Sequence, residues 1–380
     1  MNVELQLDPR RTVPAWLAYG TPVLTVLAAL AVGGVALVAL NVDPVDAYGV
    51  MFVETLTSQF GLTEVLVRAV PLILAGLAVY LPLKAGLFNI GAEGQLLLGA
   101  LAGTWVAVNV SLPAVALLPL MFLAACVAGA FWAGIPAWLR AKWDVNEIIT
   151  SLLLTFVAQE LQSYLLRGPM QGGTGNFPQS ARFSDAATLP PLAGLVPGGE
   201  SIPLFADVHA GLLVAVAAVV ATYVVMTKTR LGFEVTFVGS NDEAARQAGM
   251  SRHTVYLFVF LLGGAFAALG GIAEIAGSQG RFRAAFAPGY GFTAIPIALL
   301  GRNSAVKVTL AGLFFAVLFV GGSSVEVAFG VPAALVEIIQ ALVILFLITS
   351  EFFKRYRVGI AFDRRGNDAP ADATGGDARW

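Results

Sequence analysis

The chain has 380 residues, of which 58% are hydrophobic and only 12% are charged, with a formal net charge of −2. Soluble proteins carry about 25% charged residues, so this composition excludes an ordinary soluble globular protein. The single cysteine, Cys126, excludes an intramolecular disulfide framework. The two histidines, His209 and His253, do not suggest a metal site, and serine, histidine and carboxylate do not converge on a catalytic constellation.

Several apolar runs reach about 20 residues, which is enough to cross a hydrocarbon core of about 30 Å. We therefore predict an all-α polytopic membrane protein with about ten transmembrane segments. The expected organisation is a polar N-terminal segment over residues 1–14, one transmembrane domain over 15–353 and a disordered tail over 354–380. Multi-pass insertion in a prokaryotic plasma membrane follows as the expected location.

The first half of the chain contains regularly spaced apolar runs. The expected spans are 15–40, 63–83, 88–110, 113–139 and 146–166. The first run is too long for the h-region of a signal peptide, which has 7–15 residues. The mildly amphipathic stretch 43–62 is expected at the outer surface. Arg68 lies inside the second span and is expected to reach an interface with its long side chain.

The second half begins with a long interruption over residues 167–207, where Gly, Pro and Ser predict a loop rather than a domain. The expected spans are 209–227, 253–276, 308–321 and 332–353, with a shorter apolar piece over 291–300. That piece has about 10 residues, too few to cross unaided, and predicts a half-span or a short tilted helix. A second polar segment covers 228–252.

The positions of Lys and Arg predict the orientation. If the segments alternate from a cytoplasmic N-terminus, most of these residues fall on the inner side, including Arg10, Arg11, Arg140, Lys142, Lys228, Arg364, Arg365 and Arg379. The outer side receives Arg167, Arg182, Arg281 and Arg283. This asymmetry predicts that both termini are cytoplasmic. Interrupted helices in both halves also favour an inverted repeat, as in many transporters.

One stretch, residues 83–103, combines polar side chains with glycine inside an otherwise apolar region. Asn89, Glu93 and Gln95 lie within seven residues, next to Phe88. A charged side chain at membrane depth costs roughly 2.5–3.5 kcal/mol, so it faces a bundle interior, a water-filled cavity or a partner. We predict that Phe88, Asn89, Glu93 and Gln95 line a polar route. The alternative is a short turn followed by a helix with a small-residue packing face.

Other polar residues have two interpretations each. Glu93 either lines the route or pairs with Arg68 or Lys84. Asn146 and Glu147 form either the N-cap of a helix or a functional site. Glu274 and Glu326 are expected in solvent near outer span ends. Arg281 and Arg283 face either an acidic receptor or water.

The polar segment 228–252 contains a short helix signal. Ser240 or Asn241 is a good N-cap, acidic residues follow in the first turn, and Gly249 is placed to end the helix. So short a helix is marginal alone in water, so packing or a partner must hold it. Small residues beside charge suit a helix that lies in a groove of another protein.

The run Glu243-Ala244-Ala245 with Gly249 resembles the EAA loop of ABC importer permeases. The run Gly86-Leu87-Phe88-Asn89-Ile90-Gly91-Ala92-Glu93-Gly94-Gln95 is similar to a segment of the branched-chain amino acid/ribose-type permease family. More narrowly, it resembles the nucleoside and simple-sugar branch associated with basic membrane lipoproteins. Residues 289–301 resemble a late Gly-rich segment of that family.

The resemblance implies an importer in which two permeases, as a homodimer or a heterodimer, form the channel. Two ATPase subunits and an extracytoplasmic substrate-binding lipoprotein would be partners, besides membrane lipid; no nucleic-acid partner is expected. The residues expected to couple to the ATPase are Asn241, Asp242, Glu243, Ala244, Ala245 and Gly249. The sequence has no G-x-x-x-x-G-K-[ST] loop, so ATP would be bound by a partner, and this subunit needs no cofactor.

We thus expect ATP-driven import of nucleosides or related simple sugars by alternating access. The alternative from a different class is a gradient-driven secondary transporter or channel for a small polar solute. The helix over 243–249 distinguishes the two hypotheses, because only an ATP-coupled importer depends on this helix for transport.

Overall fold

The structure is a computed structural model that describes residues 2–9, 14–173, 177–284, 286, 289–302 and 304–363. The side chains of residues 2–9, 15–19, 22 and 351–363 are not described. The expected inner-side charges Arg10, Arg11, Arg364, Arg365 and Arg379 therefore lie outside the described residues, as does the end of the tail predicted to be disordered.

The chain forms two compact units, residues 33–340 and the terminal segments Met1–Val32 with Ala341–Trp380. In the terminal unit, strand β1 (Asn2–Pro9) pairs antiparallel with β2 (Tyr356–Asp363). Apolar residues alternate with other residues in both segments, at 3, 5 and 7 and at 358, 360 and 362, and the register aligns them. This period of two indicates strands. The expectation of a disordered tail from residue 354 is therefore corrected for its first ten residues.

The rest of the described chain is almost entirely helical, as the sequence predicted. The long helices are α1 (Ala15–Ala39), α4 (Gln59–Lys84), α5 (Ala92–Asn109), α6 (Ala114–Trp143), α7 (Glu147–Arg167), α8 (Gly211–Lys228), α11 (Arg252–Glu274), α12 (Tyr290–Gly301), α13 (Ala305–Phe329) and α14 (Ala333–Arg355). The short helices are α2 (Pro44–Tyr48), α3 (Thr55–Thr57), α9 (Arg230–Ser240) and α10 (Asp242–Gln247). Two π-helices are described, η1 (Gly49–Glu54) and η6 (Ile275–Gln279).

Seven of the described helices are long and apolar enough to cross a membrane. Helix α5 is not among them, because Glu93, Gln95 and Asn109 make it less apolar. The short apolar piece expected over 291–300 is helix α12, which has 12 residues. The expected count of about ten spans stays a prediction.

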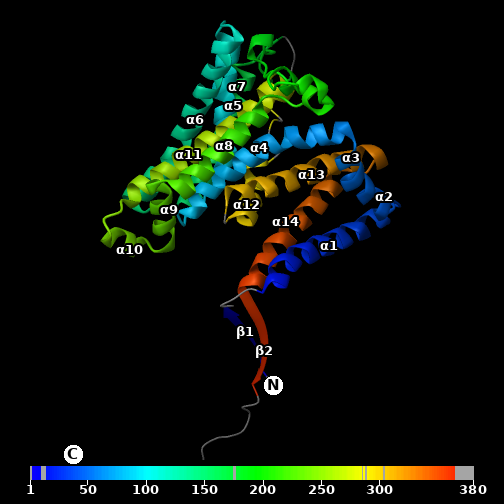
Figure 1. Ribbon diagram of the computed structural model, residues 1–380, viewed down its shortest axis with the longest axis vertical. Coiled ribbons are helices and arrows are strands. Elements are labelled where there is room, and N and C mark those ends of the chain that lie inside the picture. Colours follow the sequence, from blue (N-terminus) through cyan, green and yellow to red (C-terminus); the bar gives the residue numbers. More distant parts are fainter. Residues whose placement is uncertain are drawn as a thin grey trace, which may run out of the picture. The chain divides into compact units, whose positions relative to one another are not determined.

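Helix α4 forms the centre of residues 33–340. Its most apolar stretch is 89% buried, against 22% for the corresponding stretches of α6, α7 and α8. Helices α11, α12 and α13 pack directly against it (Figure 1). Pro71 and Pro82 interrupt its backbone hydrogen bonds, which a helix at membrane depth tolerates where neighbouring helices surround it.

Small residues bring helix α11 close to its neighbours. A Cβ added at Gly99 of α5 would meet the backbone and Cβ of Ala268 on α11, and one added at Gly103 would meet the side chain of Ile272. Gly129 of α6 and Gly264 of α11 approach each other in the same way. Such contacts are typical of helices that associate inside membranes, where close backbone packing replaces the hydrophobic effect.

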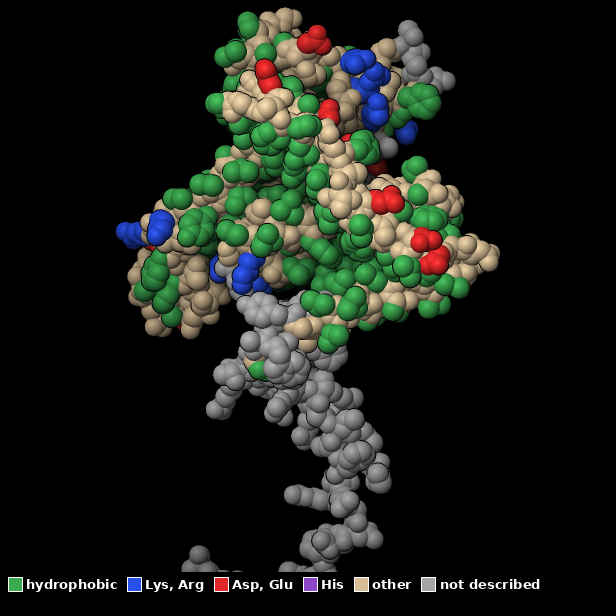
Figure 2. Space-filling view, turned by 45° about the vertical axis from the view of Figure 1, so that its right-hand side comes forward, with side chains coloured by type: hydrophobic (Ala, Val, Ile, Leu, Met, Phe, Trp, Pro, Cys, Tyr) green, Lys and Arg blue, Asp and Glu red, His purple; other side chains and the backbone are tan. Residues whose placement is uncertain are grey.

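The surface agrees with a membrane environment. Figure 2 shows hydrophobic side chains over much of the face in view, with Lys and Arg near its edges and Asp and Glu in a few scattered places. Exposed large apolar side chains occur on several long helices, among them Phe131 on α6, Phe156 on α7 and Leu310 on α13. A soluble protein rarely exposes apolar area on this scale, whereas lipid tails cover it at no cost.

Three connecting segments lie between the long helices. The stretch 43–62, expected to lie at the surface, forms α2, η1 and α3 and packs against α13. The described part of the 167–207 loop contains only the 3-10 turns η2 (Asp185–Ala187), η3 (Leu192–Gly194), η4 (Gly199–Ser201) and η5 (Pro203–Ala206). The polar segment 228–252 contains α9 in addition to the predicted short helix, because Thr229 caps it by accepting from Gly232 N–H at 3.2 Å.

Candidate functional site

A cavity of about 520 Å³ lies beside the N-terminal half of α4. It is bounded by α4, η1, α12 and α13. The residues that line it are Val50, Glu54, Phe60, Glu64, Arg68, Tyr290, Phe319, Val320, Ser323, Ser324, Val327 and Ala328. The lining thus combines aromatic and aliphatic walls with a few charged and hydroxyl groups, as small-molecule sites usually do.

Arg68 is fixed at the wall of this cavity by two neighbours from distant parts of the chain. Its Nη1 lies 3.4 Å from Glu274 Oε1 and also donates to the hydroxyl of Tyr290. The Glu274 side chain is 2% exposed, whereas that of Arg68 is 39% exposed. The buried carboxylate therefore has a charged partner, and the guanidinium still reaches the cavity.

This cluster corrects two expectations. Arg68 does not reach out to an interface but pairs inside the helix bundle, and Glu274 is buried rather than in solvent. The physical reason is that the helical chain does not stop at Glu274, the last residue of α11. It continues into the π-helix η6, so the carboxylate lies inside the bundle. Glu326, in contrast, is exposed as expected. Both described π-helices adjoin the cavity or this cluster, and π-helical segments are frequent at functional sites.

Asn89 and Gln95, predicted to line a polar route, form a buried clasp with each other. Asn89 Nδ2 donates to Gln95 Oε1 and Gln95 Nε2 donates to Asn89 Oδ1, both at 2.9 Å. Asn89 also donates to the carbonyl of Ala78 on α4 and accepts from Gly91 N–H at 3.1 Å. Both side chains are at most 1% exposed. The clasp thus ties the turn before α5 to the C-terminal third of α4.

Glu93 bonds neither Arg68 nor Lys84 in the described conformation. Its Oε2 accepts from Gly291 N–H at 2.5 Å, in the first turn of α12. A carboxylate is favoured there, because the N-terminus of a helix carries partial positive charge and unpaired N–H groups. Gly291 permits the approach, since a Cβ at this position would overlap the Glu93 backbone. None of Phe88, Asn89, Glu93 and Gln95 lines the 520 Å³ cavity.

The predicted short helix is present as α10. Asn241 is its N-cap and accepts from Ala244 N–H at 3.0 Å, and Gly249 follows its end with φ of +79°. Only glycine adopts this left-handed conformation without strain, which explains the stop at this position. Glu243 is 64% exposed and pairs with Arg246 at 2.7 Å. The helix therefore presents charge outward, while Ala245 is buried beneath it.

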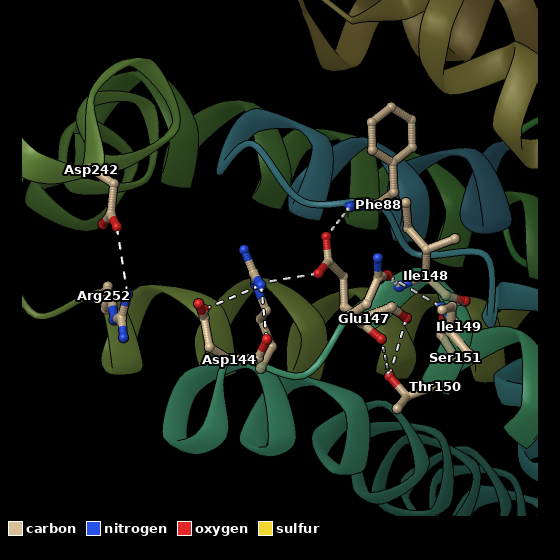
Figure 3. Close-up of polar contacts among 11 residues, drawn as sticks. Phe88, Asp144, Glu147, Ile148, Ile149, Thr150, Ser151, Asp242 and Arg252 are labelled. Atoms are coloured by element: carbon tan, nitrogen blue, oxygen red, sulfur yellow. Dashed lines mark hydrogen bonds and ion pairs between the residues drawn. The ribbon is translucent and has the colours of Figure 1, made fainter.

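Two separate groups of polar contacts lie near the start of α7 and near α10 (Figure 3). Glu147 accepts from the backbone N–H of Phe88 at 3.3 Å and lies 3.3 Å from Arg140 Nε. Asp242 of α10 pairs with Arg252 at the start of α11, at 3.7 Å.

Two further contacts complete this region. Asn146 caps α7 by accepting from Ile148 N–H at 2.9 Å, so the N-cap interpretation of this residue is confirmed. Gly239, at the end of α9, packs against the backbone of Lys84 and Ala85. Helix α9 therefore contacts the same turn that carries Asn89.

A second, smaller cavity of about 140 Å³ lies at the C-terminal end of α4. Its lining residues are Tyr80, Lys84, Tyr223, Met226, Thr227, Thr236, Ser304 and Ala305. The stretch of α4 between the two cavities, from Ala69 to Val79, is buried throughout. The two cavities are thus separated by a closed, apolar length of helix.

His209 lies just before α8 and is buried. Its Nδ1 accepts from Gly211 N–H at 3.1 Å, and burial lowers the pKa of the imidazole to about 4. The ring packs against the backbone at Gly277, where a Cβ would overlap it. His209 is therefore a neutral packing residue of the segment that leads into α8.

Comparison with known proteins supports the resemblance seen in the sequence. Residues 61–348 match the model of the family described as branched-chain amino acid transport system/permease component. The chain is 33% identical to the guanosine ABC transporter permease NupP of Bacillus subtilis, over 87% of this chain and 92% of that protein. It is 29% identical to the nucleoside ABC transporter permease NupB of Lactococcus lactis, over 86% and 89%.

A more distant relative is named for another compound. The chain is 24% identical to a probable riboflavin import permease of Treponema pallidum, over 77% of this chain and 75% of that protein. The long apolar helices, the capped α10 and the match over residues 61–348 agree with one another. This chain belongs to the branched-chain amino acid transport system/permease component family and is a multi-pass membrane permease subunit of an ABC transporter.

Proposed function

We propose that this permease imports nucleosides, driven by ATP hydrolysis on partner subunits. The observation that carries the proposal is the similarity to guanosine and nucleoside permeases over 87% and 86% of the chain. The 520 Å³ cavity has a size and a lining suitable for a nucleoside, because aromatic side chains and hydrogen-bonding groups occur together.

The route is proposed to follow α4. In the described conformation the cavity at Arg68 is the larger and the one at Lys84 the smaller, with buried helix between them. With cytoplasmic termini, the Arg68 cavity would face outward and the Lys84 cavity inward. Alternating access then requires the buried stretch of α4 to separate from its neighbours, as one half of an inverted-repeat transporter moves against the other.

Residues 241–249 are proposed to couple this motion to the ATPase subunits. Exposed Glu243 and Arg246 suit a groove in a partner, and Ala245 anchors α10 to this chain. Movement of α10 and α9 would reach Lys84 and Ala85 through Gly239, and from there the clasp of Asn89 and Gln95. In this proposal the residues predicted to line the route hold it closed in one state.

The other expected partners belong to the same proposal: a second permease subunit, an identical or a related chain, and an extracytoplasmic substrate-binding lipoprotein. The exposed residues Arg167, at the end of α7, and Arg182 and Arg283, in loops, would lie on the receptor side.

The proposal is tested by uptake of radiolabelled guanosine, uridine and ribose into cells with and without this chain, and with a Glu243→Lys variant. We expect nucleoside uptake to be lost in the deletion and to fall at least tenfold in the variant, because a reversed charge would meet the ATPase groove. Glu326→Lys, an exposed glutamate outside α10, is the matched control and should retain uptake.

A gradient-driven carrier would behave differently. Its uptake would survive Glu243→Lys and collapse with an ionophore, and that result would overturn the ATP-coupled proposal. Uptake of ribose without any nucleoside would overturn the substrate assignment alone.

A further inference from the structure

Three charged side chains line the cavity beside α4, namely Glu54 of η1 and, on α4 itself, Glu64 and Arg68. Arg68 is nine residues beyond the start of α4, roughly 14 Å along its axis at 1.5 Å per residue. Glu64 lies one helical turn earlier on the same face and lines the same cavity. Charged groups inside a membrane face water-filled cavities or substrates, because lipid does not solvate them.

The guanidinium of Arg68 is held in place, but only some of its N–H donors have hydrogen-bond acceptors. It has five N–H donors in a rigid, planar fork. Only Nη1 is engaged, by Glu274 and by the Tyr290 hydroxyl, and among the described residues Nε and Nη2 have no hydrogen-bond acceptor. Since Glu274 is buried and fixes one side of the fork, the remaining donors stay oriented without a partner of their own.

Aromatic and hydroxyl groups complete the site. Phe319 packs edge-on against Tyr290, with ring centroids 6.1 Å apart, and forms one wall; Phe60 is exposed beside the cavity. Ser323 and Ser324 donate their hydroxyl protons to backbone carbonyls one turn earlier. Their oxygen lone pairs therefore remain available as acceptors for the hydroxyls of a sugar.

We propose that this cavity selects 6-oxopurine nucleosides, with Arg68 bound to O6 and N7 of the base and Glu64 accepting from N1–H and the 2-amino group. An arginine fork matches two adjacent acceptors, and O6 and N7 provide such a pair. Cβ atoms at i and i+4 of a helix are about 5–6 Å apart, which places Glu64 next to the adjacent edge of the same ring. The inference rests on the proposed nucleoside import. It adds which class of base is selected and which residues bind that base.

The chemistry of other nucleosides sets the expected order. Adenosine has an amino donor where guanosine has O6, so it would point a donor at the guanidinium. Inosine has O6, N7 and N1–H but no 2-amino group, so it would lose part of the contact with Glu64. Pyrimidines have no pair of acceptors equivalent to O6 and N7. The preference should therefore run guanosine, inosine, and then adenosine and uridine.

The test measures initial uptake of radiolabelled guanosine, inosine and adenosine by cells that express the complete transporter, at equal surface amounts of each variant. The main variant is Arg68→Gln with Glu274→Gln, because a glutamine amide suits N6 and N7 of adenine, and an unpaired buried Glu274 would destabilise the fold. We expect the ratio of guanosine to adenosine uptake to fall about tenfold. Glu326→Gln, at an exposed position outside the cavity lining, is the control and should retain the guanosine preference.

A second variant tests the inference independently, in case the first variant does not fold. Glu64→Gln keeps the shape of the side chain and leaves Arg68 and Glu274 in place. We expect it to reduce the ratio of guanosine uptake to inosine uptake by about fivefold. Glu326→Gln, on α13 outside the cavity lining, should leave that ratio unchanged.

The outcomes separate this inference from the proposed function. If the wild-type transporter carries nucleosides and both variants keep the wild-type ratios, the binding protein or another part of the permease selects the base, and the inference is wrong. If the wild-type transporter carries no nucleoside, the proposed function itself fails. Ratios that shift as expected at unchanged surface amounts support both.

Discussion

The polar residues of the stretch 83–103 show the limit of a sequence pattern. The pattern indicated that these side chains have a role, but it did not indicate which contacts they make. Asn89 and Gln95 were expected to face a polar route because a buried amide at membrane depth needs a reason. The structure gives another reason: the two carboxamides hydrogen-bond each other, and Asn89 also hydrogen-bonds the Ala78 carbonyl and the Gly91 N–H. Fully paired polar groups at the centre of a bundle fix a single packing arrangement.

This clasp yields a prediction about stability. Asn89→Ala leaves the Gln95 carboxamide and the Gly91 N–H buried without a partner, and each such group costs about 1–3 kcal/mol. We expect a clear decrease in the melting temperature of the complete transporter in nanodiscs, followed by tryptophan fluorescence. Asn89→Leu with Gln95→Leu should recover part of the loss, because both partners are then removed together. A double variant less stable than Asn89→Ala would contradict the clasp.

Arg68 shows what one sequence cannot predict. Its partners Glu274 and Tyr290 lie 206 and 222 positions away, and no local pattern connects them. The Asn241 cap, in contrast, depends only on residues within a turn; the sequence predicted a cap at Ser240 or Asn241 together with the stop at Gly249. Glu274 was misplaced because its predicted position near a span end depended on where the helix ends.

Among the elements, local signals located the long helices well, because apolar runs and flanking caps fix them. Helix α9 was not predicted, because the polar residues at both of its ends led us to interpret the whole of 228–252 as a polar segment with one short helix. The terminal strands carry an alternation of period two that was present in the sequence but not used. Contacts between helices could not be predicted, because glycine positions alone do not say which neighbour approaches.

The close approach of α5 and α11 gives an element-scale prediction. Gly99→Ala places a methyl group against the backbone of Ala268, so the two helices must separate, at a typical cost of 1–3 kcal/mol for overpacking. Gly134→Ala is the control, because its nearest neighbour at 3.1 Å is the mobile end of the Leu261 side chain. We expect the first variant, but not the second, to lower the melting temperature. Equal effects would show that this helix contact is not tight.

At the scale of the whole molecule, composition and the spacing of apolar runs predicted a helical membrane protein, and the family resemblance predicted a permease. Neither located the 520 Å³ cavity that we propose for the substrate, because it is formed by α4, α12, α13 and η1 together and depends on their packing. The two cavities at opposite ends of α4 are the structural basis for the proposed alternating access.

The most direct measurement is labelling of introduced cysteines, which is practical because Cys126 is the single cysteine of this chain and can be replaced. In a Cys126→Ser background, Ser323→Cys places a thiol in the larger cavity and Thr227→Cys places one in the smaller. A membrane-impermeant maleimide is applied from outside to the complete transporter in cells, with and without guanosine and after trapping of the ATPase by vanadate.

We predict that Ser323→Cys reacts in the resting state, is protected by guanosine and changes in reactivity at least fivefold after trapping, while Thr227→Cys does not react from outside in the resting state. Reactivity of Ser323→Cys that is independent of both nucleoside and ATPase state would contradict the account.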